Sequence, residues 1–519
     1  MKKSLRTAAV LAAGVFVLGA CGQGDAGNSV SADGPSGDPV RGGELVYSYS
    51  VDASTLDPAA CGSSTSWQAC QAIYGMLMRF DPATGDYAPH MAAGLDTEDG
   101  RVWTLTLRDG VTFTDGTPYD ADAVAYNWER ARDPQNRSSA AAVAQRMTWQ
   151  VVDPTTVRIE LPAPNFAFPS MLYTGLGAIG SPAALEARGA DFGANPVGAG
   201  PFTLETWSRG VEMQLARNDG YWDEGKPYLD AFTIKIIADE RQRLAAVESG
   251  EADLAATILA DSAAQVEQAG LALTERPTLA AAQGLRFNFA DPAVADENLR
   301  RAVVLAMNVD EIAGVVHGGV GPATTIAPEG TRFHDPAAML PSEDLAEAQR
   351  RFDLYRSETG LDTVDVQYMI VAGIPLLAQE AQMIKAQVER IDGLTLTVLP
   401  LEIAARQAAL RNGDFMIAND SMGLNYDPEA LYERYHTAGS ENFGKYSDPQ
   451  VDAALEASRA SQDPAEVDEA YRAVLARLTE TLGVRPLFYQ TTTMYSRGDV
   501  GGTEPEYLYY PPADGLWIG

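Results

Sequence analysis

Two glycine-rich stretches of the chain have the letters of nucleotide-binding loops. Residues 175–180 read GLGAIG. That G-x-G-x-x-G pattern binds a dinucleotide only where a strand precedes it, a helix opens on its last glycine and an acidic residue follows about 20 positions on. Here Pro169 lies close upstream and Ser181-Pro182 starts a new helix. Residues 439–445 imitate a phosphate-binding loop, but they follow a helix, and Tyr446 replaces the serine or threonine that binds Mg²⁺. We therefore expect no bound cofactor.

Residues able to act as catalysts do not form a recognisable set. The nucleophile motif G-x-S-x-G is absent, and the four histidines are scattered without an H-E-x-x-H pair. Carboxylates number 71, so no single pair of them is informative. We expect neither a metal site nor an enzyme. A secreted lipoprotein hydrolase that works through paired carboxylates stays open as a distant alternative.

The first cysteine follows an export signal. Lys2, Lys3 and Arg6 precede an apolar run at 7–18, which is too short to span a bilayer, so we expect a signal peptide at 1–20. The letters LGAC at 18–21 resemble a bacterial lipobox, in which a lipid is attached to the cysteine. Cys21 is therefore the predicted membrane anchor, outside the cytoplasm. Residues 21–40 are rich in Gly, Ser and Asp and predict a flexible tether.

The other two cysteines, Cys61 and Cys70, lie close together in an exported chain, so we expect a disulfide between them. A metal site is the weaker interpretation, because no histidine lies near and the spacing matches no zinc pattern.

Composition limits the class of protein. The chain has 519 residues, 71 acidic and 38 basic side chains, a formal charge of −33 and 46% apolar residues. This is ample for large cores in two to four domains and excludes a wholly disordered chain. Phosphate backbones and anionic lipid surfaces are bound by clustered Lys and Arg, so we expect no nucleic-acid partner and no docking through a basic patch.

The elements that must position these residues alternate between strands and helices. Period-2 patterns predict strands at 43–50, 101–107, 156–161, 285–289, 363–369, 394–399, 415–418 and 485–490. Helical spacing with capping residues predicts helices at 66–77, 120–131, 239–249, 298–308 and 310–316, and a helix that begins at Ser181-Pro182. This alternation predicts α/β layers.

Several phrases together resemble one family, the oligopeptide-, dipeptide- and nickel-type solute-binding proteins of bacterial ABC importers (extracellular solute-binding family 5). They run in the family's order along nearly the whole chain after the tether. The phrases are GELVYSYS at 43–50, TLDP at 55–58, IYGML at 73–77, DPATG at 81–85, WTLTLRDGVTFTDGTP at 103–118, DAV at 122–124, NPVGAGPF at 195–202, YW at 221–222, GEAD at 250–253, FN at 287–288, LRRAVVLAM at 299–307, DP at 427–428 and YSDP at 446–449.

The resemblance implies an α/β, two-lobed periplasmic-binding-protein fold with a hinge and an extra inserted domain. Lobe I would combine 41–61, 195–283 and 490–519. The inserted domain of lobe I would be 62–194, and lobe II would be 284–489.

The resemblance also indicates where a solute would bind. Residues 419–427, NDSMGLNYD, correspond to the family's pocket-lining stretch. Peptide-binding relatives carry there an aspartate that holds the ligand's α-amino group. This chain has Leu424 or Asn425 at that point, and Asp420 could supply the anion instead. The candidate contacts are Asp420, Ser421, Met422, Asn425, Ser50, Asp52, Trp67, Asn288 and Tyr489. Trp67 could equally be a core aromatic, and Asn288 could serve hinge hydrogen bonding.

The implied function is capture of a small solute between the lobes and delivery to the permease subunits of an ABC importer. An oligopeptide is the favoured solute, with an oligosaccharide or a metal chelate as alternatives. A solute drives closure only if it binds the closed state more tightly. We expect a monomer.

Overall fold

The computed structural model describes residues 38–61, 66–81, 84–136, 138, 140–257, 265–277, 283–317, 321–421, 428–489, 491–504, 506 and 510–519. The predicted signal peptide, Cys21, Met422 and Asn425 lie outside these residues. Among the described residues, no helix is both long enough and apolar enough to cross a bilayer.

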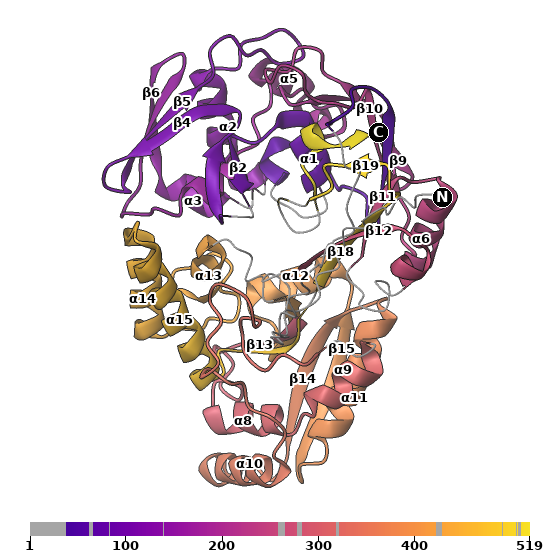
Figure 1. The fold of residues 1–519 in the computed structure, drawn as a ribbon. Coiled ribbons are helices and arrows are strands. Elements are labelled where there is room, and N and C mark those ends of the chain that lie inside the picture. Colours follow the sequence, from indigo (N-terminus) through magenta and orange to yellow (C-terminus); the bar gives the residue numbers. More distant parts are fainter. Residues whose placement is uncertain are drawn as a thin grey trace, which may run out of the picture. The chain divides into compact units, whose positions relative to one another are not determined.

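Lobe I is built on a seven-stranded sheet with the order β12-β18-β11-β1-β10-β9-β8 (Figure 1). Its central strand β1 pairs in parallel with β10 and β11, while β18 runs antiparallel to β11 and β12. All seven strands fall in the three segments expected for this lobe. Their bounds are β1 Glu44–Tyr49, β8 Phe202–Ser208, β9 Glu212–Arg217, β10 Ala231–Ile236, β11 Leu254–Thr257, β12 Ala272–Pro277 and β18 Thr491–Ser496, with helix α6 at Glu240–Ser249.

The inserted domain carries a four-stranded antiparallel sheet, β4-β5-β7-β6, and the hairpin β2-β3. Its buried side chains form one cluster with those of lobe I, in which Tyr47 of β1 and Trp128 of α2 both take part. The bounds are β2 Met78–Asp81, β3 Asp86–Pro89, β4 Ala92–Thr97, β5 Val102–Leu107, β6 Thr148–Asp153, β7 Thr156–Glu160, α1 Trp67–Tyr74, α2 Ala121–Arg132, α3 Ala141–Arg146, α4 Pro169–Tyr173 and α5 Pro182–Arg188. The shared core joins this domain to lobe I.

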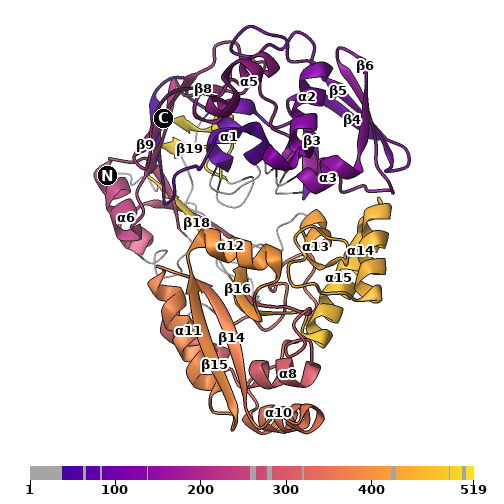
Figure 2. The same ribbon diagram turned by 180° about the vertical axis from the view of Figure 1, so that it is seen from behind.

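Lobe II is built on a five-stranded sheet with the order β15-β14-β16-β13-β17. Strands β14, β15 and β16 run parallel, and β13 runs antiparallel to β16 and β17. The strands are β13 Gln283–Phe287, β14 Val364–Val371, β15 Leu394–Leu401, β16 Ile417–Ser421 and β17 Val484–Phe488. The helices are α8 Glu297–Leu305, α9 Val309–Val316, α10 Leu345–Thr359, α11 Pro375–Val388, α12 Ile403–Asn412, α13 Pro428–Tyr435, α14 Pro449–Ala460 and α15 Pro464–Thr481. Figure 2 shows α12 and α13 at one end of this sheet.

The chain passes between the two large sheets twice, from β12 to β13 and from β17 to β18. The two passages are neighbours, because Gln283 at the start of β13 pairs with Phe488 at the end of β17. The buried side chains of lobe II form clusters separate from that of lobe I. Separate lobe cores joined by two neighbouring passages of the chain are the arrangement expected of a hinge. Short strands β19 Val500–Gly501 and β20 Trp517–Ile518 lie near the carboxyl terminus.

Local sequence explains most helix ends. Asp120 accepts a hydrogen bond from Ala123 N at 3.0 Å and so caps α2, and Ser181 caps α5 from Ala184 N at 3.2 Å. Gly250 ends α6 in the left-handed region at φ 77°. Strand β13 lies two residues earlier than expected, and the bounds differ most at β16, which starts two residues late and runs three residues further, to Ser421. Its polar end stays in the sheet because Asp420 pairs with an arginine of β13.

Candidate functional site

The end of β16 is the described part of the predicted solute-binding stretch. Asn419, Asp420 and Ser421 close this strand and pair in register with Leu285, Gly284 and Gln283 of β13, respectively. Residues 422–427, which include Met422 and Asn425, lie outside the described residues, and for Ser421 only the backbone is described. Asp420 is therefore the candidate contact of this stretch whose side chain can be assessed.

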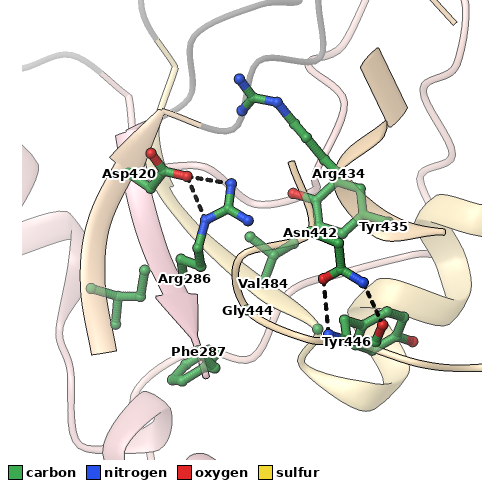
Figure 3. A pocket seen from close by; sticks show the side chains of 11 residues that line it. Arg286, Phe287, Asp420, Arg434, Tyr435, Asn442, Gly444, Tyr446 and Val484 are labelled. Atoms are coloured by element: carbon green, nitrogen blue, oxygen red, sulfur yellow. Dashed lines mark hydrogen bonds and ion pairs between the residues drawn. The ribbon is translucent and has the colours of Figure 1, made fainter. Parts of the chain in front are cut away.

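Asp420 is paired with arginines of its own lobe. Its Oδ2 lies 2.6 Å from Nε and 2.5 Å from Nη2 of Arg286 (Figure 3). Its Oδ1 lies 3.7 Å from Nη2 of Arg406. Burial alone would raise the pKa of this carboxyl, but the nearby charges of Arg286, Arg434 and Arg406 outweigh burial and lower it. Asp420 is therefore an anion compensated inside lobe II, rather than a carboxylate left open to a solute's ammonium group.

The cavity beside this ion pair is small. It is lined by residues of β13, α13 and β17, among them Phe287, Tyr435 and Val484, and has room for about 10 Å³. This is about the space that one water molecule occupies. Asn442 closes one side through hydrogen bonds with the backbone N and O of Tyr446. The ion pair and its neighbours therefore form a small polar core at the end of β16. This core has no room for a solute, which would have to bind outside it.

Arg286 and Arg406 were not predicted from the sequence. Arg286 is 8% exposed and Arg406 is 6% exposed, and burial lowers the pKa of Arg406 despite the charge of Asp420. One signal could have found Arg286, because a charged residue between Leu285 and Phe287 in an apolar strand needs a buried partner.

Of the candidates Ser50, Asp52 and Trp67, the last two make defined contacts within the protein. Asp52 accepts hydrogen bonds from Trp207 Nε1 at 3.0 Å and Gly210 N at 2.9 Å, and so holds the β8–β9 turn. Ser50 is half-buried just after β1. Trp67 is fully buried at the start of α1 and packs edge-on against Tyr173 with ring centroids 5.0 Å apart. Trp67 thus lies in the core, as the alternative interpretation of this residue expected, and its side chain is not exposed in this structure.

The disulfide partners sit beside Trp67. Cys61 and Cys70 form a disulfide with an S–S distance of 2.09 Å and Cα atoms 5.7 Å apart. Both cysteines are fully buried, and Cys70 lies in α1. The bond ties α1 to the segment that follows β1.

The two remaining candidates hold loops of lobe II. Asn288 is 2% exposed and donates to the carbonyl oxygens of Gly413 and Phe415 at 3.0 and 2.7 Å. Tyr489 donates its hydroxyl to Thr325 O at 2.8 Å. These bonds fit the structural role that was the alternative for Asn288.

The glycine-rich stretches are packing features. The helix α4, not a strand, precedes 175–180, and a Cβ on Gly177 would stand 2.1 Å from Leu172 O. Residues 439–445 follow α13, and a Cβ on Gly439 would stand 2.3 Å from Glu433 O. Across the described parts of the chain, no group of three or more His, Cys, Asp or Glu side chains is arranged to hold a metal ion.

Solved structures share this fold. The agropinic-acid complex of AgaA from A. tumefaciens R10 matches with a TM-score of 0.81 and 23% identity over 92% of this chain and 99% of that one. DppA from Helicobacter pylori in complex with the peptide STSA matches with a TM-score of 0.79 and 21% identity over 92% and 98%. NikA from Brucella suis in complex with Fe(III)-EDTA matches with a TM-score of 0.76 and 23% identity over 92% and 100%. These likenesses establish the two-lobed α/β binding-protein fold.

Sequence comparison gives the family. The glutathione-binding protein GsiB of Escherichia coli O1:K1 / APEC is 31% identical over 293 residues, which are 56% of this chain and 57% of that protein. GsiB of Salmonella paratyphi A is 32% identical over 294 residues, with the same shares. The match thus spans little more than half the length of these relatives. The family model described as "Bacterial extracellular solute-binding proteins, family 5 Middle" matches residues 86–443, more than half of the chain. The chain belongs to family 5 of the bacterial extracellular solute-binding proteins.

Proposed function

We propose that this protein captures a small peptide-type solute between its two lobes and delivers it to the transmembrane subunits of an ABC importer, without catalysis. The observation that carries the proposal is the family match over 86–443. The glutathione-binding relatives favour a short peptide, because glutathione is itself a tripeptide. The separate lobe cores and the two neighbouring passages of the chain between the sheets support closure around the solute.

The ion pair of Asp420 bears on which groups could bind the solute. A free peptide held by its ammonium group needs an uncompensated carboxylate, and Asp420 is already paired with Arg286. We infer that Asp420 keeps the strand end in place, while the groups that select the solute lie elsewhere in the cleft.

Identification of the bound solute tests the proposal. The chain would be purified from a bacterial host without denaturation, and native mass spectrometry would compare it with the same sample after unfolding and refolding. We expect an added mass of a short peptide that is lost on unfolding. An added mass that matches a series of oligosaccharides or a metal chelate would instead support one of the two alternative classes of solute. Conversion of the released solute into product would overturn the binding role in favour of a hydrolase.

We also propose that residues 1–20 are removed and that a lipid on Cys21 anchors the chain to the outer face of the cell membrane. The sequence LGAC at 18–21 supports this. The variant Cys21→Ala should leave the membrane fraction and enter the soluble exported fraction, while thermal unfolding stays unchanged. Retention of Cys21→Ala in washed membranes would contradict the anchor.

A further inference from the structure

The inserted domain touches lobe II through a group of polar contacts that we call the clasp. Its members are Arg146, Asn165 and Phe166 of the inserted domain and Glu429, Glu433 and Arg459 of lobe II. Arg146 Nη2 lies 2.9 Å from Glu433 Oε1, and Asn165 Nδ2 donates to Glu429 Oε2 at 3.3 Å. The backbone N of Phe166 donates to Arg459 O at 2.7 Å. Figures 1 and 2 both show α3, which ends at Arg146, next to α13 and α14.

The lobe II half of the clasp is held in place by lobe II itself. Glu429 is 2% exposed and is bonded to Arg459, whose Nε lies 2.9 Å from Glu429 Oε2. The guanidinium carbon of Arg459 also lies 3.0 Å from the ring centroid of Tyr432. Glu433 accepts from Ser440 N at 2.8 Å. These contacts hold Glu429 and Glu433 in place where lobe II meets the inserted domain.

Arg146 supplies the charged contact from the inserted domain to lobe II. Its guanidinium pairs with Glu433, which lies 287 positions further along the chain. Without Arg146, Glu433 would keep Arg459 at 3.6 Å and the Ser440 amide. Loss of Arg146 would therefore weaken the clasp and leave no buried charge without a partner.

The interface around the clasp is not close-packed. A cavity of about 390 Å³ lies beside it, between apolar side chains of the inserted domain, such as Met147 and Phe168, and Tyr432 of lobe II. At roughly 30 Å³ for each water molecule, this space takes about a dozen of them. The clasp contacts themselves are charged and polar, and such contacts weaken as ionic strength rises.

We propose that the clasp stabilises the closed arrangement of the lobes by seating the inserted domain on α13 and α14. The inserted domain shares its core with lobe I, so the clasp gives lobe I a contact with lobe II besides the two passages of the chain. The same helix α13 carries Arg434 and Tyr435, which line the cavity at Asp420. Under this proposal the clasp contacts are lost when the lobes open, so they add to the stability of the closed state and thereby to solute affinity.

Spin labels on the two sides measure the closure directly. The chain carrying Cys21→Ala would be labelled at Val152→Cys of β6 and Glu469→Cys of α15, which are both exposed. Distances between the labels would be recorded without solute by double electron–electron resonance at low and high salt. We expect Arg146→Ala to lower the ratio of closed to open molecules about two- to fivefold at low salt, and high salt to lower the same ratio in the unmodified clasp.

Two further variants make the test specific. The conservative variant Arg146→Lys, which keeps the charge opposite Glu433, should retain closed molecules that Arg146→Glu loses. The control Arg101→Ala removes the exposed pair Arg101–Glu160 inside the inserted domain and should leave the distances unchanged. Distances that are equal for Arg146→Ala and the unmodified clasp at both salt concentrations would overturn the proposal. Because no solute is added, this result is independent of the solute that the cleft takes.

Discussion

At the residue scale, Asp420 forms an ion pair with Arg286 and lies close to Arg406. Removal of its charge by Asp420→Asn leaves Arg286 and Arg406 facing each other in a buried site. We expect this variant to lower the free energy of unfolding by about 3 kcal/mol, as for one broken buried ion pair. Urea unfolding measures the loss.

The exposed Asp365 of β14 is the matched control for Asp420. It accepts hydrogen bonds from Thr395 and Thr397 at the surface, so Asp365→Asn should cost less than about 1 kcal/mol. If Asp420→Asn were as stable as Asp365→Asn but lost solute binding, Asp420 would be a solute contact after all.

Glu506 carries a pH-dependent part of the stability. Burial raises the pKa of its carboxyl from 4.5 to about 7, although Arg79 Nε lies 2.9 Å from its Oε1. The folded state therefore binds this proton more tightly than the unfolded state. The stability from this proton is fully present below about pH 4.5 and is lost as the pH rises through 7, which amounts to about 3 kcal/mol.

The variant Glu506→Gln separates this contribution from the rest of the acidic chain. Its amide stays neutral, and Arg79 keeps its ion pair with Asp514 at 2.6 Å. Between pH 5 and pH 8 the unmodified protein should lose about 2–3 kcal/mol more stability than Glu506→Gln. Equal losses in urea unfolding at the two pH values would show that Glu506 titrates like an exposed glutamate.

At the scale of elements, the sequence predicts best where local chemistry decides. The alternation at 101–107 and the caps Asp120 and Ser181 place β5, α2 and α5 to within about a residue, because period and capping act locally. The end of β16 was missed, because a strand that ends in Asn-Asp-Ser is disfavoured by propensity and is stabilised here by Arg286 of another strand. The clasp and the arginines around Asp420 escaped prediction for the same reason, since their partners are far apart in sequence.

The bond between Cys61 and Cys70 fixes the start of α1 against lobe I. In the chain-entropy account, a loop this short contributes about 2–3 kcal/mol to stability. The double variant Cys61→Ala, Cys70→Ala should lose that amount in thermal unfolding, and a reducing agent should destabilise the unmodified protein alone. A thiol reagent that labels both cysteines before reduction would contradict the bond.

At the scale of the whole molecule, the charge of −33 describes the exterior more than the solute. The acidic groups described at the candidate site and in the clasp are paired with arginines, as Asp420 is with Arg286 and Glu433 with Arg146. The net charge thus gives no reason to expect a cationic solute. The family and two-lobed fold could be predicted from ordered sequence phrases, whereas the solute could not, because selectivity depends on a few side chains around the cleft.

Calorimetric titration of the solute-free protein tests the central claim most directly. Glutathione and a set of short peptides would be added in turn, with oligosaccharides and a nickel chelate as the competing classes, and each solute would be recovered and weighed by mass spectrometry. The account predicts saturable binding of at least one peptide-type solute, with one site per chain and the solute recovered intact. Binding confined to a sugar or a chelate, or recovery of a cleaved product, would contradict it.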